Sequence, residues 1–81
     1  MGKKMDVSVA FGKALRHLRI AKNLTQEQLG LEAGLRRTFI SSLELGQKQP
    51  SLETIQKLAV VLELSLSKLF QQIEKDINQK T

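Results

Sequence analysis

Two adjacent arginines stand where a short helix is expected to begin, in the stretch GLRRTFISSLELG at residues 34–46. A cation at the N-terminal end of a helix is disfavoured by roughly 0.3–1 kcal/mol, because the helix dipole is positive there. Ser, Thr, Asp and Asn are the residues that usually cap this end. We therefore interpret Arg36 and Arg37 as residues kept for binding an anion.

On a helical wheel the same stretch separates into an apolar face and a polar face. Phe39, Ile40 and Leu43 fall together and are expected to pack on the core. The opposite face holds one long cation and several short hydroxyl side chains. An α-helix that enters the major groove of DNA needs short side chains, and one Arg can bond O6 and N7 of guanine. This face favours base reading over an ordinary solvated face, which usually carries Glu/Lys pairs. Its polar members are Arg37, Thr38, Ser41 and Ser42.

The positive charge of the chain is unevenly distributed. The net charge is +5, and residues 1–50 hold nine Lys or Arg against four Asp or Glu. Residues 51–81 hold four of each kind and contribute no net charge. A basic half of a domain is typical of nucleic-acid binding. The alternative is a charge that serves only solubility.

The elements that must position these side chains are expected to be five helices in one all-α domain. Apolar spacing predicts them at about residues 9–22, 25–33, 36 or 37 to 45, 52–62 and 66–77. Thr25, Ser51 and Ser65 are the expected N-caps. Only Gly34 and Leu35 separate the second helix from the third, and so short a turn suits a steep crossing, as in a helix-turn-helix. We expect residues 1–8 to form a flexible N-terminal segment and residues 9–78 to form the domain.

The apolar stripe of the last helix continues past the point where the core of so small a domain should end. We expect a second copy of the chain to cover it, so that the last helix is a dimerisation helix. The alternative is that the stripe folds back onto the core of the same chain. The residues expected in this dimer interface are Val61, Leu64, Phe70, Ile73 and Ile77.

Several function classes are disfavoured by composition. The chain has no cysteine, which excludes disulfides and Cys-based zinc sites and fits a reducing cytoplasm. No apolar run approaches the 18 or so residues of a membrane span, and no signal peptide is visible. The single histidine, His17, has no metal-binding companions, and no acid/base pair or phosphate loop is present. We expect neither an enzyme nor a cofactor.

At this point the sequence resembles a known family. Residues 24–70, LTQEQLGLEAGLRRTFISSLELGQKQPSLETIQKLAVVLELSLSKLF, are similar to the Cro/phage-repressor, or XRE-type, helix-turn-helix proteins. The shared features are the Thr-Gln helix start, the Gly-Leu turn, the Glu-x-Gly ending, the Pro-Ser-Leu cap and the Ser-Leu-x-x-Leu-Phe segment. The size and the long last helix also resemble the controller proteins of restriction–modification systems. The resemblance implies a five-helix lambda-repressor-like fold with its helix-turn-helix at the second and third helices.

The resemblance also implies roles for particular residues. Bases would be read by Arg36, Arg37, Thr38, Ser41 and Ser42. Phosphates would be held by Thr25, Gln26, Gln47 and Lys48, with Gln26 also bracing Arg37. Arg19 and Glu44 match a buried ion pair that ties the first helix to the third.

The function implied is a homodimeric transcriptional regulator that binds a pseudo-palindromic operator in double-stranded DNA and blocks or recruits RNA polymerase there. One alternative is an antitoxin or a restriction–modification controller that regulates its own operon. Another is a protein-interaction module that has kept the fold without DNA binding. Salt-sensitive DNA affinity distinguishes this last alternative from the other two.

Overall fold

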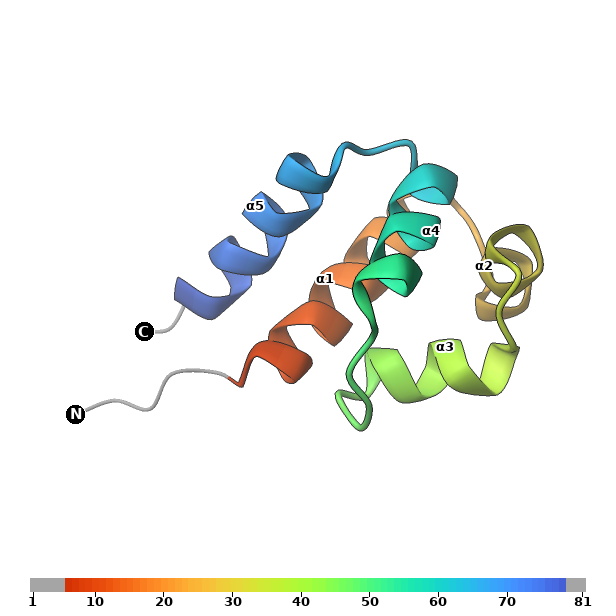
Figure 1. The fold of residues 1–81 in the computed structure, drawn as a ribbon, viewed down its shortest axis with the longest axis horizontal. Coiled ribbons are helices and arrows are strands. Elements are labelled where there is room, and N and C mark those ends of the chain that lie inside the picture. The colour runs from red at the N-terminus through yellow and green to blue at the C-terminus, as the bar shows by residue number, and fades with distance from the viewer. Residues whose placement is uncertain (1–5, 79–81) are drawn as a thin grey trace.

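Five α-helices make up the computed structural model, which describes residues 6–78 (Figure 1). They are α1 (Val7–Ala21), α2 (Gln26–Ala33), α3 (Arg37–Glu44), α4 (Leu52–Leu62) and α5 (Leu66–Asn78), and the described range contains no strand. The all-α, five-helix prediction is confirmed. None of the described helices has the length and apolar character needed to cross a membrane.

The helix ends follow local capping signals. The Thr25 hydroxyl accepts a hydrogen bond from the Gln28 amide at 3.0 Å, and the Gln28 side chain accepts one from the Thr25 amide at 2.8 Å. Ser51 and Ser65 each accept a bond from the amide three residues further on. Gly34 ends α2 in the left-handed conformation, with φ of 73°, which glycine adopts without steric cost. The predicted caps are therefore confirmed.

The N-terminal boundary differs from the prediction. Helix α1 begins at Val7 rather than at Val9, because the Asp6 side chain caps it by accepting a bond from the Ser8 amide at 2.8 Å. Ser8 is buried. The prediction of a flexible segment is therefore wrong for residues 7 and 8, and its first five residues lie outside the described range.

The core lies where the five helices meet. Helix α1 packs against α3 and α5, α2 packs against α3 and α4, and α4 also packs against α5. In Figure 1 α2 is seen nearly end-on while α3 lies across the view, so the two cross steeply, as expected of a helix-turn-helix. The fully buried large side chains come from every helix: Leu15, Leu29, Ile40, Leu43, Leu58 and Leu69.

Helix α5 packs along α1, and this contact corrects the expected dimer interface. Ile73 is only 5% exposed in the single chain and belongs to its core. Val61, Leu64 and Ile77 are partly buried against the same core. The alternative, in which the stripe folds back onto its own chain, therefore describes Ile73 correctly. Of the five residues expected in the interface, Phe70 is the one with a large exposed side chain, at 40%.

Two glycines allow close approaches that position α3. A Cβ on Gly12 in α1 would lie 2.4 Å from the carbonyl oxygen of Leu43 and 2.7 Å from that of Glu44. The backbones of α1 and α3 therefore touch at the end of α3. A Cβ on Gly30 would lie 2.6 Å from the carbonyl oxygen of Leu35, in the turn that leads into α3. The close approach at Gly30 is thus to this turn and to the first residue of α3.

Replacing Gly12 by alanine is expected to destabilise the fold. At an open helix position the same change would stabilise by about 1 kcal/mol, whereas here the clash with two carbonyl groups should cost about 1–3 kcal/mol. Urea unfolding measures the difference, with Lys13→Ala, at an exposed position of the same helix, as the control. A Gly12→Ala protein as stable as the control would mean that α1 and α3 do not approach this closely.

Candidate nucleic-acid interface

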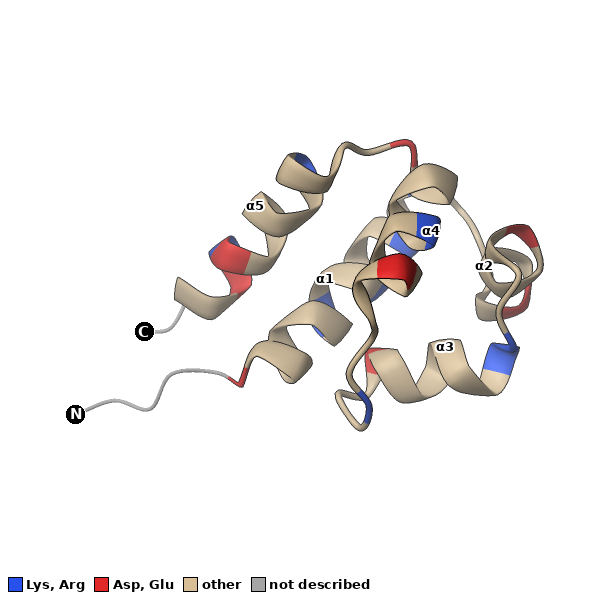
Figure 2. Cartoon of the chain, viewed as in Figure 1, with Lys and Arg blue, Asp and Glu red and all other residues tan. Residues whose placement is uncertain are grey.

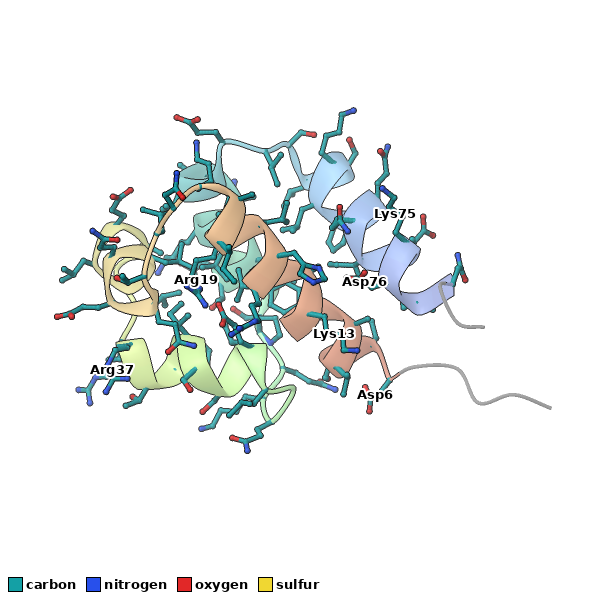
Figure 3. The ribbon with its side chains drawn as sticks, turned by 180° about the vertical axis from the view of Figure 1, so that it is seen from behind. Asp6, Lys13, Arg19, Arg37, Lys75 and Asp76 are labelled. Carbon is teal, nitrogen blue, oxygen red and sulfur yellow. The ribbon has the colours of Figure 1, made fainter. Side chains whose placement is uncertain are left out.

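Helix α3 has a buried face and an exposed polar face, as its sequence predicts. Ile40 and Leu43 are completely buried, and Phe39 packs partly buried against the core. On the other side the residues proposed to read bases remain accessible. Arg37 lies at the outer end of α3 and points away from the rest of the chain (Figure 3). The exposed residues are Arg36, Arg37 and Thr38, and the partly exposed residues are Ser41 and Ser42.

The start of α3 is electrostatically suited to an anion. Arg36 occupies the N-cap position with an extended backbone, and its side chain makes no capping hydrogen bond. The first amides of a helix have no partner within the helix and carry the positive end of its dipole. Two arginines stand at this same end, where Figure 2 shows the ribbon in the colour of Lys and Arg. This concentration of positive charge favours an anion such as a phosphate, or the hydrogen-bond acceptors on the edge of a guanine.

The candidate phosphate contacts flank α3. Gln47 and Lys48 are exposed in the loop that follows it, and Figure 2 shows the basic position in this loop. Thr25 is exposed and Gln26 is partly exposed at the start of α2. Each candidate residue is therefore accessible to a ligand.

The partner of Gln26 differs from the expectation. Its side-chain Nε2 donates a hydrogen bond to Glu44 Oε1 at 3.0 Å, and this replaces the expected brace on Arg37. The physical reason is that Glu44 Oε1, which already accepts a bond from Arg19 Nη2, has a second lone pair that Gln26 can reach, whereas Arg37 is exposed to solvent. Gln26 therefore begins α2 as part of a polar network on the buried side of α3.

The centre of that network is the ion pair between Arg19 and Glu44, which the sequence predicts. Arg19 Nε donates to Glu44 Oε2 at 2.6 Å and Arg19 Nη2 donates to Glu44 Oε1 at 3.0 Å. The two side chains are 10% and 3% exposed. The hydrogen bond to Glu44 raises the pKa of Arg19, although burial opposes this shift. The guanidinium therefore stays charged, and Figure 3 shows Arg19 on α1, above α3 in that view.

Two contacts of this network are not predicted from the sequence. Arg19 Nη1 also donates to the carbonyl oxygen of Leu24 at 2.8 Å, and Gln26 shares Glu44 with Arg19. A bidentate Arg–carboxylate pair with further hydrogen bonds is the geometry in which a buried charge is well compensated. The network fixes the end of α1, the start of α2 and the end of α3 relative to one another. It therefore positions the exposed polar face of α3 without being part of it.

Comparison with known proteins identifies the arrangement. A family model described as helix-turn-helix matches residues 15–69 of the chain. The chain belongs to this helix-turn-helix family. The resemblance drawn from the sequence is thereby confirmed, and α2 and α3 are the two helices of the motif.

The relatives include regulators of two kinds. The control protein C.MunI of a Mycoplasma species is 39% identical over 72 residues, which cover 88% of this chain and 97% of the relative. The helix-turn-helix transcriptional regulator PuuR of Escherichia coli is 37% identical over 70 residues, which cover 86% of this chain but 38% of the relative. Among solved structures, the restriction–modification controller protein C.AhdI of Aeromonas hydrophila is 44% identical with a TM-score of 0.75. That match covers 78% of this chain and 96% of C.AhdI.

Breaking the ion pair from one side is expected to be far more damaging than removing it entirely. Arg19→Met leaves the Glu44 carboxylate buried without its partner, at a cost of roughly 3–5 kcal/mol in the free energy of unfolding. The double variant Arg19→Met, Glu44→Met removes both charges and should lose less than the single variant. Urea unfolding of the two variants and the parent measures this, and a double variant less stable than Arg19→Met would contradict the burial described for the pair.

Proposed function

We propose that the chain is a transcriptional regulator that binds a pseudo-palindromic operator in double-stranded DNA as a homodimer. The observation that carries this proposal is the exposed face of α3. It places two arginines at an uncapped helix start beside short hydroxyl side chains. A buried ion pair behind this face holds it in place. Membership of the helix-turn-helix family supports the same conclusion.

In the proposed complex α3 lies in the major groove. Arg37 bonds the O6 and N7 atoms of a guanine, and Thr38, Ser41 and Ser42 contact neighbouring base edges. Arg36 contacts a base or a phosphate beside them. These side chains supply the sequence preference, because the major groove presents a distinct pattern for each base pair.

Phosphates on either side of this groove are held by the segments that flank α3. Thr25 and Gln26 present the start of α2, where free amides and the helix dipole favour a phosphate. Gln26 gives one side-chain hydrogen to Glu44, so its second amide hydrogen remains for a phosphate oxygen. Gln47 and Lys48 contact the backbone after α3. These contacts fix the register of α3 in the groove without selecting a sequence.

In a homodimer each copy contributes one eight-residue α3, so the complex has two recognition helices. Two recognition helices about 34 Å apart reach successive major grooves on one side of the duplex. The operator would then mirror the two-fold symmetry of the protein. RNA polymerase is the proposed downstream partner, either excluded from an overlapping promoter or recruited beside it.

A restriction–modification controller that regulates its own operon is the more specific candidate. It is supported by the coverage of the relatives, since the match to C.MunI covers 97% of that control protein and the match to C.AhdI covers 96% of that controller. The larger regulator PuuR is matched over only 38% of its length. The matched residues therefore correspond to nearly all of each controller protein but to only part of PuuR.

The experiment that tests the proposed function is selection of genomic DNA fragments on the purified protein at physiological salt, followed by sequencing. We expect an enriched motif with two-fold symmetry, its half-sites one or two helical turns apart. Affinity for that motif should fall steeply as salt increases, because bound phosphates release counterions. Enrichment of no motif would contradict the proposal and favour a protein-interaction module.

Replacing Arg37 by alanine should weaken binding to the selected operator by about 1–3 kcal/mol and relax the preference at one base pair of each half-site. The reason is the loss of a bidentate contact to guanine. Titration of operators that carry each of the four base pairs at that position measures both effects. Unchanged affinity and unchanged base preference would show that α3 is oriented differently.

The matched comparison is Lys48→Ala, which removes one charge from a proposed phosphate contact. It should weaken binding to all operators about equally. It should also reduce by about one the slope of the logarithm of affinity against the logarithm of salt concentration. Lys68→Ala removes the same charge from an exposed position at the start of α5 and should change neither quantity.

A further inference from the structure

Leu45, which follows the last residue of α3, has a large apolar side chain that is 65% exposed. A single exposed leucine needs no explanation of its own, because every protein surface includes many apolar atoms. The position of this leucine is what distinguishes it. Its side chain belongs neither to the buried core nor to the partly buried residues packed against that core. It therefore contributes little to the stability of the single chain.

The backbone carries Leu45 onto the outer face of α3. Its φ of −85° and ψ of −1° remain in the right-handed helical region, and its amide donates a hydrogen bond to the carbonyl oxygen of Ser41 at 3.0 Å. Helical geometry therefore extends to this residue. At about 100° per residue, Leu45 lies about 80° around the axis from Arg37, and Ser42 lies about 140° from it. Leu45 is thus in the middle of the face that carries the proposed base-reading side chains.

Contacts on both sides hold the backbone of Leu45 in place. The Glu44 side chain before it is 3% exposed and is paired with Arg19 of α1. Gly46 after it has a φ of 74°, and a Cβ there would lie 2.9 Å from Cγ2 of Val9, also in α1. The leucine is therefore presented from a fixed backbone, so little ordering is required when it meets a ligand.

We propose that Leu45 selects a thymine in the operator by contacting its C5-methyl group. The proposal rests on the DNA binding of the proposed function and adds a specificity-determining residue to it. Hydrogen-bond donors and acceptors make up the rest of the major-groove pattern, and the thymine methyl is the apolar group in it. A leucine forms no side-chain hydrogen bond, so beside a phosphate or a guanine it would displace water without compensation. Beside the methyl group, two apolar surfaces leave water together.

The thymine contacted by Leu45 lies at a different base pair from the guanine proposed for Arg37. Leu45 follows Arg37 by eight positions, which corresponds to about 12 Å along the helix axis. Stacked base pairs are only about 3.4 Å apart. The guanine and the thymine are thus two separate determinants of one half-site.

Replacing single thymines of the selected operator by deoxyuridine tests the contact, because deoxyuridine keeps the pairing of thymine and lacks only the C5 methyl. The parent should bind about fourfold more weakly when one particular thymine of a half-site is replaced, since the burial of one methyl group is lost. Leu45→Ala should bind the thymine operator more weakly and should no longer distinguish thymine from deoxyuridine at that position. Titration of both proteins on both operators completes a double-mutant cycle, which isolates this contact.

Three controls accompany this cycle. Leu31→Ala removes the same atoms from α2, where the leucine is 76% exposed, and should keep the affinity of the parent and its response to deoxyuridine. Thr38→Ser removes the other methyl group from the outer face of α3 and should keep the response at the Leu45 position. Urea unfolding of Leu45→Ala should match that of the parent, because Leu45 lies outside the core.

Several results would overturn the proposal. One is a parent that binds equally well with deoxyuridine at every position, and another is a selected motif that contains no thymine. A deoxyuridine effect that persists in Leu45→Ala and disappears in Thr38→Ser would assign the methyl contact to Thr38. Weaker self-association of Leu45→Ala in sedimentation, with an unchanged deoxyuridine effect, would place Leu45 between two copies of the chain.

DNA selection and the deoxyuridine series separate this proposal from the proposed function. Enrichment of no motif would contradict the regulator, and the contact at Leu45 would fall with it. A symmetric motif that is bound without any deoxyuridine effect would support the regulator and contradict the role of Leu45 alone.

Discussion

The reading surface depends on one buried ion pair, between Arg19 and Glu44. Helix α3 has eight residues and only two fully buried side chains, Ile40 and Leu43, so apolar contacts alone give it little orientation. Apolar packing is non-directional, whereas two parallel hydrogen bonds between a guanidinium and a carboxylate fix both distance and angle. A buried charge is tolerated only in such a geometry. The polar network therefore supplies the directional constraint that the small core lacks.

The same constraint explains why an unfavourable helix start is retained. Arg36 provides no capping bond and Arg37 stands at the positive end of the helix dipole, so α3 is poorly stabilised at its first turn. Contacts at its other end offset this weakness, where Gly12 lets α1 approach the backbone of α3 and Glu44 joins the buried network. The stabilising contacts and the proposed DNA contacts of the two arginines thus lie at opposite ends of one helix.

The sequence predicts those parts of the structure that are decided within a few residues. The caps at Thr25 and Ser51 and the turn at Gly34 follow from side chains and amides three or four positions apart, and the two faces of α3 follow from helical periodicity. The start of α1 was accessible to the same reasoning, since aspartate is a preferred N-cap. The residues proposed to read bases could also be predicted from the sequence, because a single helix positions all of them.

The structural features that the sequence does not predict depend on contacts between distant segments. Ile73 belongs to the core because α5 lies along α1, more than fifty residues away in sequence, and the bond from Gln26 to Glu44 likewise joins two helices. In the proposed homodimer, the contact between the two copies would set the separation of the half-sites, and α3 would set the choice of base. Operator spacing and operator sequence are then controlled by separate residues, so either one is free to change while the other is retained.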